Sequence, residues 1–172
     1  MEVKDGQLYI INVHSKKGWL GFSIRLIEHI KFGKYAYSNH SAFLCQDKGI
    51  WYVWEAEAQG VIKTEWNKWN IDSIKTKDFT LSVIPDHYKI TVNSQLWANY
   101  ANESVGEGYD YYDLLFVQPI DILTGIELSD NNNTKTICSR YCAKIEKEFT
   151  VGIISDDNIC PAELYKINSK LK

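Results

Sequence analysis

Apolar residues recur at helical spacing in several segments of the chain. This spacing predicts helices over four segments, namely 19–32, 91–104, 111–123 and 138–149. Pro119 is expected to kink or end the third of these helices, and Pro161 suits the first turn of a short terminal helix. The pattern is clearest in the fourth helix, whose inward-facing stripe comprises Cys138, Tyr141, Cys142, Ile145 and Phe149.

The segments outside these helices contain short runs typical of strands. They are residues 6–13, 40–46, 50–56, 60–66 and 79–84. Asp47, Lys48 and Gly49 separate the second run from the third, which indicates a hairpin. A polar loop at 129–134 can cap the helix that follows it. With no repeat and no linker, the chain is predicted to form one α+β domain over residues 1–172.

Composition excludes several classes of protein. The net charge of −3 gives no basic footprint for nucleic acid, and no apolar run reaches the length of about 18 residues that a spanning helix needs. The N-terminus, MEVKDGQLYI, has charges where a signal peptide needs an apolar run. We therefore expect a cytoplasmic protein with four free thiols, although release by lysis or transport in a virion is compatible with the sequence, and export by another route would allow one pair to be bridged.

The stretch TKTICSRYCAKI, residues 134–145, holds two cysteines at the start of the last long helix. Cys142 lies between apolar neighbours and is expected to pack in the core. Cys138 lies on the first turn, where free N–H groups and the helix dipole stabilise a thiolate, so it is either a core residue or a nucleophile. Two cysteines without a closely spaced histidine pair do not form a structural zinc site, and no metal or other cofactor is expected.

A thiolate nucleophile needs a base, and His40 is the best placed of the four histidines. It begins a predicted strand, on the same face as Ala42 and Leu44, against a core layer. The others end a strand, lie inside a helix or follow a proline in a turn, in the order His14, His29 and His87.

The next strand has two carboxylates, Glu55 and Glu57, on the same face as Trp51 and Val53. A carboxylate on such a face either has a partner or lies on a solvated face of the sheet. One length of the loop between the two strands places Glu55 opposite His40, and a one-step change in that length places Glu57 there. A three-residue turn places neither glutamate opposite His40. The sequence leaves the register open.

Five motifs, taken in this order, resemble those of the permuted papain-like thiol hydrolases of the YiiX type, which are relatives of the NlpC-type peptidases and of lecithin:retinol acyltransferase. The motifs are NHSAF, WEAEAQGV, GEGYDYYDL, ICSRYCAKI and CPAEL, and the resemblance covers nearly the whole chain. It implies a circularly permuted papain-like fold, in which an antiparallel sheet packs against helices and the histidine strand precedes the cysteine helix.

The resemblance also implies roles for individual residues. Cys138 is expected to be the nucleophile, His40 the base, and Glu55 the residue that orients the imidazole, with Glu57 as the alternative. Tyr109 is expected to be a second oxyanion donor or a groove wall, or else a core aromatic. The family has an acidic residue after Cys-Ser, whereas this chain has Arg140.

The expected activity is cleavage of an amide bond in a peptide or cell-wall-like substrate through an acyl-enzyme. An acyltransferase or lipid hydrolase uses the same chemistry on an acyl-containing substrate. A further alternative is a binding module without turnover, whose groove stacks sugar rings on aromatic residues. The candidates for such stacking are Trp51, Trp54, Trp66, Trp69 and Trp97.

Overall fold

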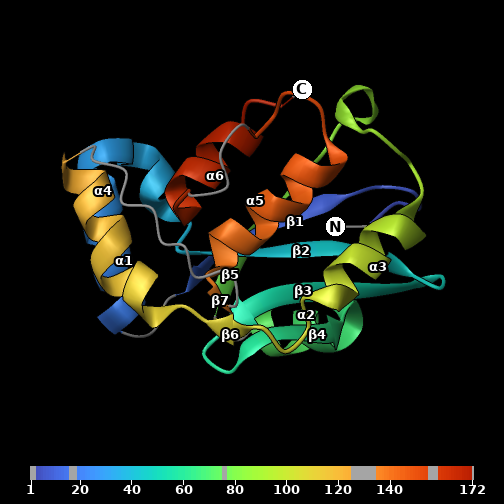
Figure 1. Ribbon diagram of the computed structural model, residues 1–172, viewed down its shortest axis with the longest axis horizontal. Helices are drawn as coiled ribbons and strands as arrows, with labels where there is room; N and C mark the ends of the chain where they lie inside the picture. Colours follow the sequence, from blue (N-terminus) through green and yellow to red (C-terminus); the bar gives the residue numbers. More distant parts are fainter. Residues whose placement is uncertain (1–2, 16–18, 75–76, 125–134, 155–158, 172) are drawn as a thin grey trace.

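The computed structural model describes residues 3–15, 19–74, 77–124, 135–154 and 159–171, and the predicted capping loop at 129–134 lies outside them. A five-stranded antiparallel sheet forms the centre of the molecule, in the order β4-β3-β2-β1-β5 (Figure 1). Its strands are β1 (Tyr9–Ser15), β2 (His40–Asp47), β3 (Ile50–Glu57), β4 (Gly60–Glu65) and β5 (Lys77–Val83). The predicted α+β class and all five strands are confirmed.

Helices surround this sheet. They are α1 (Trp19–Phe32), α2 (Trp66–Ile74), α3 (Ser94–Glu103), α4 (Gln118–Thr124), α5 (Cys138–Phe149) and α6 (Pro161–Asn168). Shorter elements are the 3-10 turns η1 (Gly33–Tyr37) and η2 (Asp86–Tyr88), the π-helical segment η3 (Asp113–Val117), and a small parallel pair, β6 (Gly108–Tyr109) and β7 (Lys135–Thr136). Pro161 occupies the first turn of α6, as predicted.

The two faces of the sheet bury different sets of side chains. On one face α3 and α5 cover Phe43 and Trp54, which belong to the larger core cluster together with Cys142 of α5. On the other face α2 packs against β3, and its Trp69 lies in a second cluster with Leu44 and Val53. Alternating side chains of one strand therefore enter two separate cores, as the period of a strand requires.

Three local features differ from the predictions. The predicted strand 60–66 ends one residue early, because the unpredicted helix α2 begins at Trp66. On α1, helical spacing aligns Leu26 and Ile30 on one side of the helix, but both are exposed, so this part of the helix does not bury its apolar side chains. Of the two outcomes predicted for Pro119, an end of the helix is wrong, because α4 continues past it; the irregularity appears as π-helical turns directly before α4, where an N–H donor is missing at the proline.

The β2–β3 hairpin closes with a two-residue turn. Asp47 pairs with Ile50, and both Lys48 and Gly49 have positive φ angles, of 52° and 80°. This is the combination that a type I′ turn requires, and the twist of that turn matches the twist of the strands. The turn fixes the register of β2 against β3, which the sequence left open.

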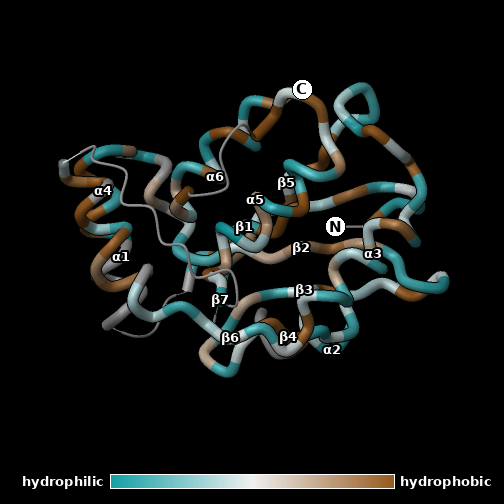
Figure 2. Tube along the Cα trace, in the orientation of Figure 1, coloured by the Kyte–Doolittle hydropathy of each residue, from teal (hydrophilic) through white to brown (hydrophobic). Residues whose placement is uncertain are grey.

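One end of the molecule is rich in exposed apolar side chains. Figure 2 shows hydrophobic stretches along α1 and α4, which pack together beyond the end of the sheet.

No helix in the described part of the chain combines the length and apolarity needed to cross a membrane. All four cysteines are free thiols.

Glu146 provides a prediction for the pH dependence of stability. Its side chain is fully buried on α5, and Asn168 Nδ2 donates a 2.8 Å hydrogen bond to it. Burial raises the pKa of Glu146 to about 8, although the Asn168 bond opposes the shift. The folded state holds this proton more tightly than the unfolded chain does. The contribution of Glu146 to the free energy of unfolding is therefore fully present below pH 4.5 and is lost as the pH rises through 8.

We expect Glu146→Gln to reduce this loss, since an amide keeps the bond to Asn168 and has no proton to lose. Urea unfolding at intervals from pH 5 to 9 measures the effect. Burial also raises the pKa of Glu28 to about 8, so part of the slope should persist in the variant. Equal slopes for both proteins would contradict the assignment to Glu146.

Candidate active site

Cys138 is the first residue of α5 and is almost completely buried. The N-cap residue, Ile137, has no side chain that accepts hydrogen bonds from the first turn. The free N–H groups of that turn therefore remain available to an anion at the helix start. Next to it, Ser139 Oγ donates a 2.6 Å hydrogen bond to the carbonyl of Ile159 and so ties the turn to the chain before α6.

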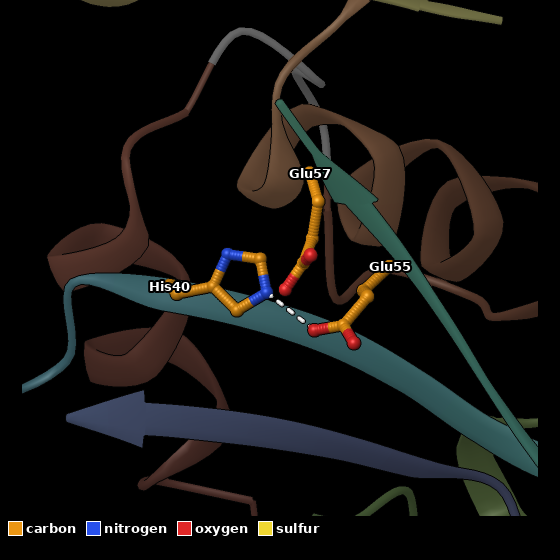
Figure 3. Close-up of side chains that lie close together, drawn as sticks. All are labelled: His40, Glu55 and Glu57. Carbon is orange, nitrogen blue, oxygen red and sulfur yellow. Dashed lines mark hydrogen bonds and ion pairs between the residues drawn. The ribbon is translucent and has the colours of Figure 1, made fainter. Parts of the chain in front are cut away.

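His40 is held at the start of β2. Ser38 Oγ donates to the carbonyl of His40 at 3.0 Å, and the N–H of Asn39 donates to the carbonyl of Val13 at 3.0 Å. The imidazole is 17% exposed, so one edge of the ring reaches solvent. Its Nε2 donates a 2.8 Å hydrogen bond to Glu55 Oε2 (Figure 3).

Glu55 is a buried carboxylate with both oxygens bonded. Oε2 accepts from His40, and Oε1 accepts a 2.6 Å hydrogen bond from Trp69 Nε1 on α2. The side chain is only 3% exposed, so leaving either oxygen without a donor would be costly. Trp69 therefore fixes the carboxylate that in turn fixes the imidazole. Sequence reasoning missed this role of Trp69, because it did not predict the helix that presents it.

The register explains why both glutamates lie near the ring. Phe43 pairs with Trp54, and continuing this register brings Glu57 opposite His40. The His40 ring nevertheless reaches diagonally to Glu55, a distance that long side chains span on one face of a sheet. Glu57 extends toward the same ring from the next position along the face (Figure 3).

The charge state of His40 reflects its neighbours. Burial disfavours the charged ring, but the negative charge of Cys138 and its hydrogen bond to the ring, followed by those of Glu55, outweigh burial and raise the pKa of His40 to about 10. His40 therefore interacts with the sulfur on one side and the carboxylate on the other. Since Glu55 occupies Nε2, the nitrogen that remains for the sulfur is Nδ1.

The other three thiols lie in different surroundings. Burial raises the pKa values of Cys45, Cys142 and Cys160. A thiol in apolar surroundings remains protonated and inert near neutral pH. Cys142 packs in the core, as the sequence predicted.

Tyr109 and Arg140 lie near the helix start. Tyr109, on β6, pairs with Thr136 on β7, two residues before Cys138, and its ring contacts that of Tyr111 at a centroid distance of 5.0 Å. The Tyr109 side chain is half-buried. Arg140 is buried on the first turn of α5.

The tryptophans expected to line a binding groove divide into two groups. Trp54, Trp69 and Trp97 are buried core residues, so they present no face to a sugar ring. Trp51 and Trp66 are half-buried and line an open pocket of about 430 Å³ together with Ile50. Of the five candidates, Trp51 and Trp66 are therefore the ones that border a pocket open to solvent.

Comparisons with known proteins give no independent assignment. A scan against protein-family models found no match, and a search of curated proteins found no similar sequence.

Proposed function

We propose that the chain is a cysteine hydrolase that cleaves an amide bond through an acyl-enzyme. Cys138 is the nucleophile, His40 the general base and acid, and Glu55 the residue that orients the ring. The observation that supports the proposal is the position of the His40 ring, which interacts with the helix-start sulfur and is hydrogen-bonded to a buried carboxylate. Three residues far apart in the chain are thus arranged in the order that nucleophilic catalysis needs.

The reaction proceeds in two halves. His40 holds the proton taken from Cys138, and the thiolate attacks the substrate carbonyl carbon. Free N–H groups of the first turn of α5, with Tyr109 as a second donor, stabilise the oxyanion. His40 then protonates the amine nitrogen, the C–N bond breaks and a thioester remains.

Water resolves this thioester in the second half. His40 removes a proton from the water, whose oxygen attacks the thioester carbon. The C–S bond breaks, a carboxylic acid leaves and the proton returns to the Cys138–His40 pair. An amine or alcohol acceptor in place of water would give a transferase with the same residues.

The proposed fold assignment is the permuted papain-like fold. It rests on the order of the elements, because the strand bearing His40 precedes the helix that begins with Cys138, and on the packing of α5 against β2 and β3.

A pH profile of alkylation tests the proposal. With iodoacetamide at neutral pH, Cys138 should be modified faster than Cys45, Cys142 and Cys160, because burial holds those three as thiols. Peptide mass spectrometry assigns each modified site, and the fast phase should be absent in Cys138→Ser. Equal, slow labelling of all four cysteines would favour a binding module, and Trp66→Ala would then be the variant to test for loss of sugar binding.

A comparison of Glu55→Gln with Glu57→Gln identifies the orienting residue. Only one variant should show a strong loss of turnover, and the hydrogen bonds of Glu55 to His40 and Trp69 favour Glu55. An amide at position 55 keeps the shape but removes the charge that stabilises the imidazolium, which should lower kcat by about 10²-fold or more. Similar rates for the two variants would place the orienting role elsewhere.

One feature favours the lipid or acyl-transfer alternative as a second candidate. The helical segment from Tyr111 to Thr124 follows Tyr109 directly and has large apolar side chains exposed to solvent. Exposed apolar stripes of this kind mark surfaces that bind apolar ligands or membranes. The stripe comprises Tyr111, Tyr112, Leu115, Phe116, Ile120 and Leu123.

Trapping of the acyl-enzyme separates the two candidates. The protein is incubated with a peptide amide, a short-chain ester or a long-chain ester, quenched in acid and analysed by mass spectrometry. A thioester on Cys138 formed from the peptide supports the amidase. Accumulation only from the long-chain ester supports the lipid candidate.

A further inference from the structure

We infer that His40, Glu55 and Glu57 form a binding site for a divalent transition-metal ion, with Zn²⁺ as the best fit, and that the bound ion inhibits the enzyme. The inhibitory consequence rests on the proposed function, whereas the binding itself does not. One candidate ligand atom from each residue lies within 4.8 Å of the other two. All three side chains extend toward a common point (Figure 3).

The donor set matches zinc chemistry. Zinc binds imidazole nitrogen and carboxylate oxygen at about 2.0–2.2 Å, and sites with three protein ligands leave the fourth position to water. Ligand atoms in a tetrahedral site lie roughly 3.5 Å apart by these bond lengths. His40 Nε2 and Glu55 Oε2, which are 2.8 Å apart, must therefore separate slightly, and the Glu57 oxygen, which lies within 4.8 Å of the other ligand atoms, must adjust its position. Glu57 is half-buried at the end of β3 and can supply this movement. A ring nitrogen among the ligands disfavours Mg²⁺, which prefers oxygen.

The surroundings of the cluster support a bound ion. Trp69 Nε1 donates to Glu55 Oε1, which leaves Oε2 directed at His40 and at the ion position. Ligating carboxylates are commonly held in this way by an outer hydrogen bond. The 17% exposure of the imidazole provides access from solvent.

Binding at this position would stop catalysis at His40. The ion takes the Nε2 lone pair and displaces the proton that Nε2 donates to Glu55. The remaining ring proton then stays on Nδ1, so the ring cannot accept a proton from Cys138. Glu55, engaged by the ion, no longer stabilises an imidazolium. The sulfur of Cys138 is not among the proposed ligands, which come from His40, Glu55 and Glu57.

Titration calorimetry of Cys138→Ser with Zn²⁺ tests the site without the thiol. We expect one ion per chain, and binding at least about 10-fold weaker when Glu57→Gln is added. Glu65→Gln is the matched control, since Glu65 is an exposed carboxylate at the end of the neighbouring strand β4. His40→Ala in the same background is the second test variant and should also lose binding.

The outcomes distinguish the site from its alternatives. Unchanged Zn²⁺ affinity in both the Glu57→Gln and His40→Ala backgrounds would overturn the proposal, and so would binding that requires the Cys138 thiol. In the wild-type protein, Zn²⁺ should slow alkylation of Cys138, and EDTA should restore the rate. If Cys138 shows no fast alkylation but calorimetry detects the site, the hydrolase assignment fails and the metal site stands.

Discussion

Replacing His40 by alanine is expected to lower turnover by about 10²–10⁴-fold, the usual contribution of a general acid–base residue. The same change should slow alkylation of Cys138 near neutral pH, because the positive charge next to the sulfur is lost. The neighbouring Cys138 and Glu55 hold the pKa of His40 at about 10 despite its burial. The wild-type ring therefore remains charged through the neutral range, and the difference between the two proteins should narrow as the pH approaches 10.

Two controls accompany this measurement. His87→Ala removes an exposed histidine from η2 and should leave both rates unchanged. Circular dichroism and the unfolding midpoint establish that His40→Ala keeps its fold. Alkylation kinetics identical to wild type at every pH would show that the imidazole does not support the thiolate, and the proposed pairing would fail.

Replacing Gly60 by alanine should produce the largest loss of stability among single methyl additions at the described glycines. Gly60 has a φ of +109°, and a Cβ there would lie 2.3 Å from the carbonyl oxygen of Glu107. That oxygen cannot retreat freely, because it accepts a 2.8 Å hydrogen bond from the N–H of Val61. Backbone strain and steric overlap together should cost about 2–5 kcal/mol.

Gly49→Ala is the matched control for this change. Gly49 also has a positive φ, of +80°, but an added Cβ would meet nothing within 4 Å. Its cost should be limited to backbone strain, about 1–2 kcal/mol. Urea unfolding at constant m-value measures both variants. Equal losses would show that the contact with Glu107 contributes nothing to the effect.

The predicted elements were accurate where one period dominated the local sequence. Residues 138–149 repeat apolar side chains at three and four positions, and α5 has these bounds. The helix α2 was missed because it directly follows β4, and its tryptophans continue the aromatic character of the strands. For α1 the helix was predicted correctly, but apolar spacing does not show which side is buried, since Leu26 and Ile30 are exposed while Glu28 is buried. Apolar periodicity cannot anticipate a buried carboxyl that accepts a hydrogen bond from the N–H of Ala162.

The candidate site was identifiable only in part. Alternation along a strand already put Glu55 and Glu57 on one face of β3, because successive side chains point to opposite sides, but whether that face is the one His40 occupies depended on the register. The choice between the two glutamates depended on the turn and on a diagonal contact. Direct pairing favours Glu57, but Trp69 holds the carboxylate of Glu55 where the ring can reach it. The contact between His40 and Cys138 joins segments that are far apart in the chain.

The sequence by itself determined the α+β composition, the inward stripe of α5 and the position of Cys138 at a helix start, because these follow from interactions between residues close along the chain. Tertiary structure alone decided which carboxylate bonds to His40, that Trp69 supports it, and that three side chains form a cluster suited to zinc. Those features depend on a turn that sets strand register and on a helix that packs against the opposite face. Neither leaves a periodic pattern in the residues it brings together.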